Sequence, residues 1–222
     1  MHYHQQPQSE VAAFVASRII GLLGEGKRVL WLLSGGSGGQ VCIEASKLLA
    51  GHDLSRLFVT MSDERYGALD HPDENVHQLL NGGLTLPGAV FYRPLTGAGR
   101  EETTAAFAAW LRDVSAKVDY RIATLGIGAD GHTCGIKPHS VAVSSTNPAV
   151  SFTGEDFERI TITTDFLRSL DEAVVQAYGA DKHKVVQRLL TGNGTIDDYP
   201  MLAIHDIPRV TVFSNYQKEK TS

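Results

Sequence analysis

The stretch KRVLWLLSGGSGGQV, residues 27–41, joins a continuous apolar run to a turn that contains four glycines and two serines. An apolar run without alternation is typical of a strand that is buried on both faces of a sheet. The next residues, GQVCIEASKLLAG at 39–51, have helical spacing and end in glycine, as many helices do. The stretch therefore predicts a buried strand, a glycine loop and a helix.

Strands and helices continue to alternate on both sides of this stretch. VAAFVASRIIGLLG, residues 11–24, predicts a first helix with Ser9 as its N-cap, and the polar segment 139–157 is expected to be irregular. No repeat or linker divides the chain, so we expect one α/β domain over residues 1–222 with a mainly parallel sheet. Further strands are expected within SRLFVTMSDERY (55–66), VFYRPL (90–95), YRIATLGIGADGHT (120–133), ERITIT (158–163), EAVVQAYG (172–179) and RVTVFS (209–214), and helices within ENVHQLL (74–80), EETTAAFAAWLRDVSAKV (101–118) and DKHKVVQRLLTG (181–192).

Composition limits the partners that we expect. The 20 Lys and Arg residues are outnumbered by 25 Asp and Glu, and no basic cluster is interleaved with aromatic residues, so neither nucleic acid nor an acidic membrane is an expected partner. No apolar run approaches the roughly 20 residues of a membrane helix. Cys42 and Cys134 offer no disulfide framework, so we expect two buried thiols in a soluble, cytoplasmic protein. The sequence leaves the oligomeric state open.

Three of the expected strands end in polar or glycine-rich segments: SGGSGG (34–39), SDER (62–65) and GADGHT (128–133). In an open parallel sheet, ligands bind beyond the carboxyl ends of the strands. We therefore expect the three segments to meet along one edge of the sheet and to form a single site there.

The first of these segments has the chemistry of a phosphate-binding loop. Backbone N–H groups of a glycine-rich turn that enters a helix can converge on an anion, and the helix dipole favours negative charge there. The turn lacks the Lys-Ser/Thr pair of a nucleotide P-loop. Gly35, Gly36 and Ser37 are thus candidate ligands of a small phosphorylated metabolite, and a tight strand-to-helix turn without a ligand is the alternative.

Cationic and acidic side chains follow other strands. In SDER, the guanidinium of Arg65 can bind a phosphate through two N–H groups and the carboxylate of Asp63 can accept sugar hydroxyls, although such a tetrapeptide is also typical of a surface turn. Lys182 is expected at a helix start, where its charge opposes the dipole. A bound phosphate would remove that conflict, and an exposed lysine is the alternative. Arg159 opens the segment ERITIT.

The segment GIGADG, residues 126–131, formally matches a dinucleotide fingerprint, which would indicate a dehydrogenase. It lies late in the chain instead of in the first strand–helix–strand unit, and Pro138 blocks a long helix after it, so we reject that interpretation. Asp130 and His132 are the informative residues. An imidazole held by a carboxylate can take a proton from water, which makes His132 a candidate general base. The remaining histidines show no metal-ligand spacing.

Together these segments resemble the 6-phosphogluconolactonase family, within the wider group that also holds glucosamine-6-phosphate deaminases. The resemblance implies a Rossmann-like three-layer α/β/α fold and hydrolysis of 6-phospho-D-glucono-1,5-lactone in the pentose phosphate pathway, without a metal or organic cofactor. The matching segments follow the family's order over roughly residues 28–215: LSGGSGG, MSDERYGALDHPDENVHQLL, TLGIGADGHTCGIKP, ERITIT and YGADKHKVV. By position, the resemblance assigns phosphate binding to Gly35, Gly36, Ser37, Arg65 and Lys182, with Arg159 as a neighbour, and polar active-site roles to Asp63, Asn75, Asp130 and His132, the histidine activating water.

One departure from the family pattern bears on function. Lactonases usually have Ala-Ser-Leu-Phe between Gly-His-Thr and Pro, whereas this chain has CGIK at residues 134–137. Deaminases carry a glutamate where Lys137 stands, and a lysine cannot supply that carboxylate, so the deaminase interpretation weakens. Two alternatives to a lactonase remain: a deaminase or isomerase of a phosphorylated amino sugar, and a sugar-phosphate-binding regulator without catalysis.

Overall fold

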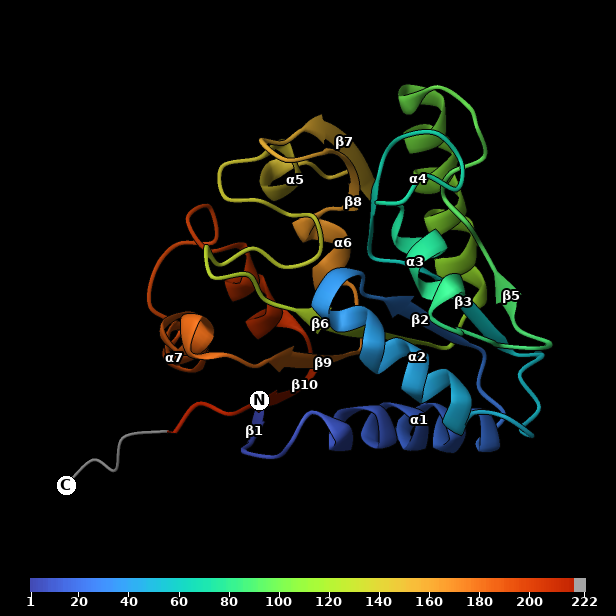
Figure 1. The fold of residues 1–222 in the computed structure, drawn as a ribbon, viewed down its shortest axis with the longest axis horizontal. Coiled ribbons are helices and arrows are strands. Elements are labelled where there is room, and N and C mark those ends of the chain that lie inside the picture. Colours follow the sequence, from blue (N-terminus) through green and yellow to red (C-terminus); the bar gives the residue numbers. More distant parts are fainter. Residues whose placement is uncertain (218–222) are drawn as a thin grey trace.

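The computed structural model describes residues 1–217 and has a parallel sheet covered by helices on both faces (Figure 1). The strands of this main sheet are β1 (His2–His4), β2 (Val29–Leu33), β3 (Leu57–Met61), β5 (Val90–Phe91), β6 (Tyr120–Gly126), β9 (Glu172–Ala177) and β10 (Arg209–Ser214). A second, antiparallel sheet contains β4 (Asp63–Arg65), β7 (Ala149–Thr153) and β8 (Glu158–Ile162). The helices are α1 (Ser9–Gly24), α2 (Gly39–Leu48), α3 (Asn75–Asn81), α4 (Arg100–Lys117), α5 (Val141–Ser144), α6 (Thr164–Arg168) and α7 (His183–Thr191), with 3₁₀ turns η1 (Gly36–Gly38), η2 (Ala180–Lys182) and η3 (Pro200–Asp206).

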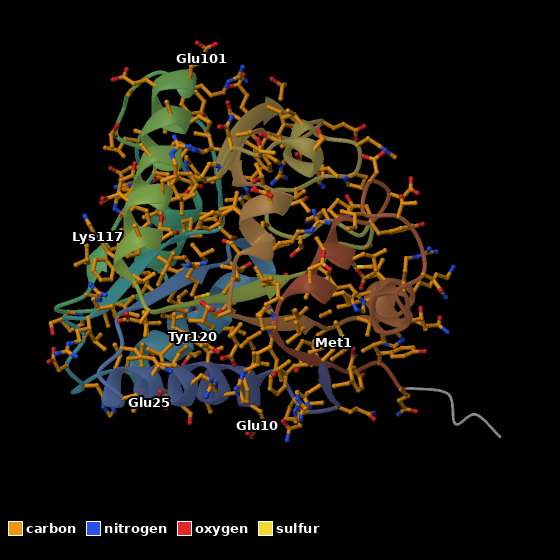
Figure 2. All side chains as sticks on the ribbon, turned by 180° about the vertical axis from the view of Figure 1, so that it is seen from behind. Met1, Glu10, Glu25, Glu101, Lys117 and Tyr120 are labelled. Carbon is orange, nitrogen blue, oxygen red and sulfur yellow. The ribbon has the colours of Figure 1, made fainter. Side chains whose placement is uncertain are left out.

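Strand β2 lies inside the main sheet, as its unbroken apolar run predicts. All five of its residues are buried, and it pairs in parallel with β3 on one side and β6 on the other. Val29, Trp31 and Leu33 pack with α1, α2 and α3 on one face, whereas Leu30 and Leu32 pack with α4, α6 and α7 on the opposite face. This alternation produces the three-layer α/β/α arrangement. Figure 2 shows the layers from behind, with Glu25 at the end of α1 and Glu101 and Lys117 along α4.

The order of the strands places a crevice beside β2. The main sheet runs β1-β10-β9-β6-β2-β3-β5, so the chain builds outward from β2 through β3 to β5 and then returns to β6 on the other side of β2. Where the winding direction reverses, the loops after neighbouring strands turn to opposite faces and leave room for a ligand. The loops at this switch point are those after β2 and β6, which carry SGGSGG and GADGHT.

Several local expectations were wrong. The segment 55–66 is not a single strand ending in charge: β3 ends at Met61, and Asp63 begins β4, which leaves the main sheet and pairs antiparallel with β8. The segment 139–157 is not irregular, since it contains α5 and β7, and β7 forms a hairpin with β8. Ser9 is the first residue of α1 and not its cap; Gln8 takes the cap position without a side-chain hydrogen bond. No helix within residues 1–217 is long and apolar enough to span a bilayer.

Candidate active site

A cavity of about 290 Å³ lies beyond the carboxyl ends of β2, β3, β6 and β9. Its wall is formed by the segments after β2, β6 and β9, by β4 and the start of α3 after β3, and by β8 with the tip of the β7–β8 hairpin. The structure thus brings the three polar segments to one place. Nine of the ten predicted site residues line this cavity: Gly35, Gly36, Ser37, Asp63, Arg65, Asn75, His132, Arg159 and Lys182. The tenth, Asp130, does not line the cavity but contacts Nδ1 of His132.

The glycine loop is shaped by close contacts that a side chain would prevent. A Cβ atom on Gly35 would lie 2.2 Å from Oδ1 of Asn75, and Gly36 has a φ of +53°, in the left-handed region that glycine adopts without strain. The loop is tied to strand β9, because Nε2 of Gln176 donates a hydrogen bond to the carbonyl of Ser37 at 3.1 Å. The loop leads through η1 into α2, so its backbone N–H groups have the helix-start arrangement that binds anions.

Arg65 lies next to this loop. A Cβ atom on Gly36 would be 4.0 Å from Nη2 of Arg65, and Nη1 donates to the carbonyl of Asp73 at 3.3 Å. The guanidinium stacks on the ring of Phe157, with Cζ 4.5 Å from the ring centroid. A guanidinium over an aromatic face can still donate its remaining N–H groups to an oxyanion. Arg65 and the glycine loop therefore form one anion-binding end of the cavity.

Glu64 holds Arg65 and Asn75 in place from beneath the surface. Its side chain is fully buried, and its carboxylate accepts hydrogen bonds from the backbone N–H groups of Arg65 (2.8 Å), Asn75 (2.6 Å) and Val76 (3.0 Å). Burial raises the pKa of Glu64, and the three N–H donors, which favour the ionised carboxylate, oppose that shift. The carboxylate thus joins β4 to the first turn of α3.

Asn75 lines the cavity and carries an unused hydrogen-bond acceptor that lies against Gly35. Its Nδ2 donates to the carbonyl of Asp63 at 3.0 Å, and the residue is almost completely buried. Its Oδ1 is also buried and has no hydrogen-bond partner within residues 1–217. A buried acceptor without a partner is costly, so a ligand hydroxyl that donates to Oδ1 would be bound favourably.

His132 and Asp130 form a pair at the other end of the cavity. Nδ1 of His132 lies 2.5 Å from Oδ1 of Asp130, and the same oxygen accepts from the backbone N–H of His132 at 3.1 Å. Burial acts to raise the pKa of Asp130, but its hydrogen bonds and attraction to His132, with help from Lys137, hold that pKa well below its usual range. An ionised Asp130 fixes the imidazole proton on Nδ1, so Nε2 is the nitrogen that can act as a base.

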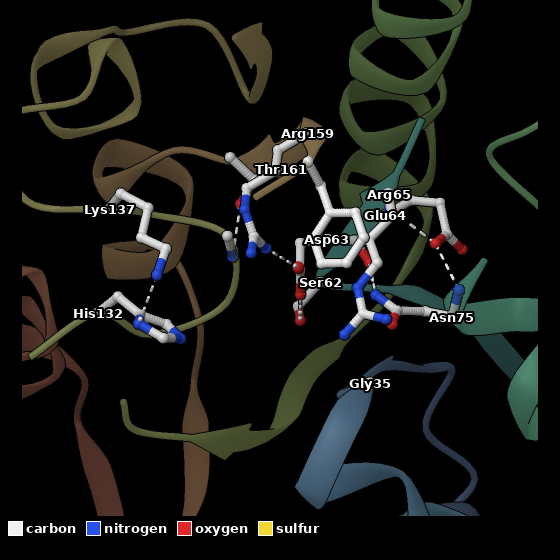
Figure 3. A network of polar contacts seen from close by, with 12 residues as sticks. Gly35, Ser62, Asp63, Glu64, Arg65, Asn75, His132, Lys137, Arg159 and Thr161 are labelled. Carbon is white, nitrogen blue, oxygen red and sulfur yellow. Dashed lines mark hydrogen bonds and ion pairs between the residues drawn. The ribbon is translucent and has the colours of Figure 1, made fainter. Parts of the chain in front are cut away.

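Asp63 and Arg159 lie between the two ends (Figure 3). The side chains of both are about nine-tenths buried, and Nη1 of Arg159 is 3.6 Å from Oδ2 of Asp63. Arg159 also forms an ion pair with Asp156 at 2.7 Å, and its guanidinium faces the same Phe157 ring as Arg65 does. Burial raises the pKa of Asp63, and the charges of Arg159 and His132 oppose this.

Lys182 is placed at the mouth of the cavity by strand β9. It is the N-cap residue of α7 and lines the cavity, and its side chain makes no hydrogen bond or ion pair with any residue from 1 to 217. The conflict with the helix dipole that the sequence indicated is therefore present in the structure. An anionic ligand near Lys182 would relieve it.

Eight residues of this wall were not among the predicted site residues: Ser34, Gly126, Ile127, Gly128, Cys134, Lys137, Asp156 and Phe157. The last two belong to the hairpin tip, which alternation in AVSFT (149–153), followed by the glycine in TGED, could have indicated. Cys134 was expected to be a buried thiol, yet it is only partly buried, with a left-handed φ of +54°, and burial still raises its pKa to about 12. Cys42 is buried as expected. No three or more His, Cys, Asp or Glu side chains within residues 1–217 are grouped to hold a metal ion.

Comparison with known proteins gives concordant results. The family described as glucosamine-6-phosphate isomerases/6-phosphogluconolactonase matches residues 4–212. A curated 6-phosphogluconolactonase of Synechocystis sp. is 26% identical over 198 residues, which cover 84% of this chain and 81% of the relative. Another, from Rhizobium meliloti, is 30% identical over 144 residues, covering 60% of this chain and 62% of the relative.

Solved structures show the same fold. The 6-phosphogluconolactonase of Trypanosoma brucei superposes with a TM-score of 0.77 at 19% identity, covering 100% of this chain and 98% of its own. A 6-phosphogluconolactonase from Shewanella baltica gives 0.77 at 22% identity, covering 96% of each chain. A monomeric glucosamine-6-phosphate deaminase gives 0.79 at 21% identity, with 96% of this chain and 97% of its own covered. Because the deaminase fits equally well, the fold does not discriminate between the two activities.

Proposed function

The chain belongs to the glucosamine-6-phosphate isomerase/6-phosphogluconolactonase family, and from that premise we propose that it hydrolyses 6-phospho-D-glucono-1,5-lactone to 6-phosphogluconate. The observation that carries the proposal is that one cavity holds a glycine loop with Arg65 and, at its other end, the imidazole of His132 held by Asp130. The curated relatives, all named 6-phosphogluconolactonase, support this choice of reaction.

The anion-binding end would bind the phosphate of the substrate. Backbone N–H groups come from the glycine loop, at Gly35, Gly36 and Ser37. Positive charge comes from Arg65 and Lys182. Within residues 1–217 no carboxylate pairs closely with either charge; the carboxylate nearest to Arg65 is that of Asp73, at 4.0 Å. Binding the phosphate there positions the sugar ring across Asp63, Asn75 and Arg159, which offer partners for its hydroxyls. Such positioning converts binding energy into orientation of the reacting carbon.

The imidazole would then catalyse hydrolysis. Nε2 of His132 takes a proton from a water molecule as the water oxygen attacks C1, and the carbonyl becomes an oxyanion. The oxyanion collapses, the bond from C1 to the ring oxygen breaks, and the ring oxygen takes the proton from the imidazolium. Asp130 stabilises the imidazolium throughout. No step in this scheme uses a metal or an organic cofactor.

An amino-sugar phosphate is the alternative substrate. The deaminase resemblance requires a glutamate at position 137, and Lys137 lies there with its ammonium 3.3 Å from Nδ1 of His132. A cation at that point cannot accept the protons that ring opening of an amino sugar releases. We therefore expect no ammonia release from glucosamine 6-phosphate. As a lactonase, the enzyme would act in the pentose phosphate pathway of the cytoplasm.

The test is turnover of the lactone by the purified protein and by His132→Asn. We expect the wild type to hydrolyse the lactone well above the spontaneous rate, and His132→Asn to lose about 10²- to 10⁴-fold in kcat, the usual contribution of a general base. His52→Asn is the matched control, because His52 is exposed and precedes β3, at the opposite edge of the sheet. Full activity of His132→Asn would show that another group activates the water.

A further inference from the structure

Lys137 lines the cavity beside His132 (Figure 3). Its Nζ is 3.1 Å from Oδ2 of Asp130 and 3.3 Å from Nδ1 of His132, and its side chain keeps 27% of its surface exposed. The turn that carries it, at residues 133–138, is fixed by the bridge between Thr133 and Ile136 and by the bond from Gly135 N–H to Oγ1 of Thr161. The ammonium is therefore held next to the imidazole by the fold.

The ammonium of Lys137 has hydrogen-bond donors to spare. A lysine carries three N–H groups, and one of them is used by Oδ2 of Asp130. Nδ1 of His132 lies 2.5 Å from Oδ1 of Asp130. Because the ring proton on Nδ1 is donated to Asp130, Nδ1 cannot accept a hydrogen bond from Lys137. Two N–H groups of Lys137 are then available at the cavity wall.

The other cations of the cavity wall contact groups other than His132, although Nε of Arg159 is buried without a hydrogen-bond partner within residues 1–217. Arg65 lies against the glycine loop, and Arg159 is paired with Asp156 at 2.7 Å and faces Asp63 at 3.6 Å. Lys182 belongs to the start of α7, beyond β9. Within residues 1–217, Lys137 is thus the cationic side chain in contact with His132, at Nδ1 on the side of Asp130. Lys137 also lines the cavity, and the reacting carbon must lie near Nε2 of the same imidazole.

We propose that Lys137 is a catalytic residue that donates a hydrogen bond to the C1 oxygen: the lactone carbonyl, then the oxyanion, then the product carboxylate. The inference rests on the lactonase function proposed above. As water adds to C1, negative charge grows on the carbonyl oxygen while His132 becomes positive. A fixed ammonium stabilises the oxyanion without reorganisation, which is the most effective form of electrostatic catalysis. After the ring oxygen leaves, the same N–H groups face a full carboxylate.

Binding of two ligands that differ only at C1 tests this role. 6-Phosphogluconate carries a carboxylate at C1, and glucitol 6-phosphate carries a CH₂OH group there with the same phosphate. In calorimetry, we expect Lys137→Met to lower the affinity for 6-phosphogluconate about tenfold or more, which is the contribution of one charge-assisted hydrogen bond. The affinity for glucitol 6-phosphate should stay within about twofold of the wild-type value. Retained binding of glucitol 6-phosphate also shows that the variant is folded.

Lys182→Met is the matched control, since it removes a lysine from the phosphate end. This variant is expected to lower the affinity for both ligands by the same factor. If Lys137→Met weakens both ligands equally, or neither, Lys137 does not contact the C1 oxygen and only supports Asp130, and the proposal is overturned.

Turnover gives the second readout. We expect Lys137→Met to lower kcat about 10²-fold, as loss of an oxyanion donor does, with little change in KM, and Lys137→Arg to recover part of that loss. An unchanged kcat would overturn the proposal. Wild-type protein that fails to hydrolyse the lactone would instead reject the lactonase function, while the ligand pair still reports whether Lys137 binds a C1 carboxylate.

Discussion

Gly128 has no space for a side chain, and its neighbours are the two residues of the catalytic pair. A Cβ atom there would lie 2.2 Å from Cε1 and Nδ1 of His132 and 2.5 Å from Oδ1 of Asp130. The backbone of Gly128 also donates to the carbonyl of His132 at 2.9 Å. The glycines of GIGADG match a dinucleotide fingerprint, but Gly128 has another role: it allows the imidazole of His132 to pack against the backbone. The place of GIGADG in the sequence was enough to reject the fingerprint, but this role of Gly128 could not be predicted, because it depends on a side-chain orientation.

Gly128→Ala is expected to displace the imidazole and lower kcat at least tenfold, with KM nearly unchanged because the phosphate end is untouched. Steady-state kinetics with the lactone measure both constants. Gly21→Ala is the control: its Cβ would meet nothing within 4 Å, and alanine there should keep full activity and stabilise α1 by about 0.5–1 kcal/mol. Normal kcat in Gly128→Ala would mean that His132 does not work from its position against Asp130 and Gly128.

At the scale of elements, the site depends on α3, which ENVHQLL (74–80) predicted, and on β4, which the sequence did not separate from β3. β4 follows β3 after a single residue, Ser62, and the charges of SDER were attributed to the end of the preceding strand. Which strand Asp63 and Arg65 pair with is decided by β8, almost a hundred positions later, and no local pattern reveals a pairing of that range. The buried Glu64 then fixes the start of α3 through three backbone N–H groups.

Glu64→Gln tests this connection between β4 and α3. The amide NH₂ of glutamine must face one of the N–H groups that now donate to the carboxylate, and a buried unsatisfied donor costs about 1–3 kcal/mol. We expect a lower melting temperature and a rise in KM of about tenfold, because Arg65 and Asn75 shift together, with a smaller change in kcat. Glu44→Gln, on the exposed face of α2, should change neither. A KM equal to that of the wild type would show that Glu64 does not contribute to substrate binding.

For the whole molecule, the position of the site follows from the topology. The sequence predicted the α/β fold and the family, and both are confirmed by the sheet order and by the match over residues 4–212. The convergence of SGGSGG, SDER and GADGHT was predictable because parallel strands share a carboxyl edge. The hairpin that carries Asp156 and Phe157 could have been predicted from AVSFT and TGED, but its place at the cavity could not, because no strand pattern specifies how a second sheet packs there. The roles assigned to individual site residues stay predictions.

The central claim is that one sugar phosphate spans the cavity, with its phosphate at the glycine loop and its C1 at His132. A crystal structure of the protein with 6-phosphogluconate measures this most directly. We predict phosphate oxygens within hydrogen-bond distance of the Gly36 and Ser37 N–H groups, Arg65 and Lys182, and the C1 carboxylate beside Nε2 of His132 and Nζ of Lys137. A phosphate bound at the His132 end, or a C1 carboxylate at the glycine loop, would contradict the account.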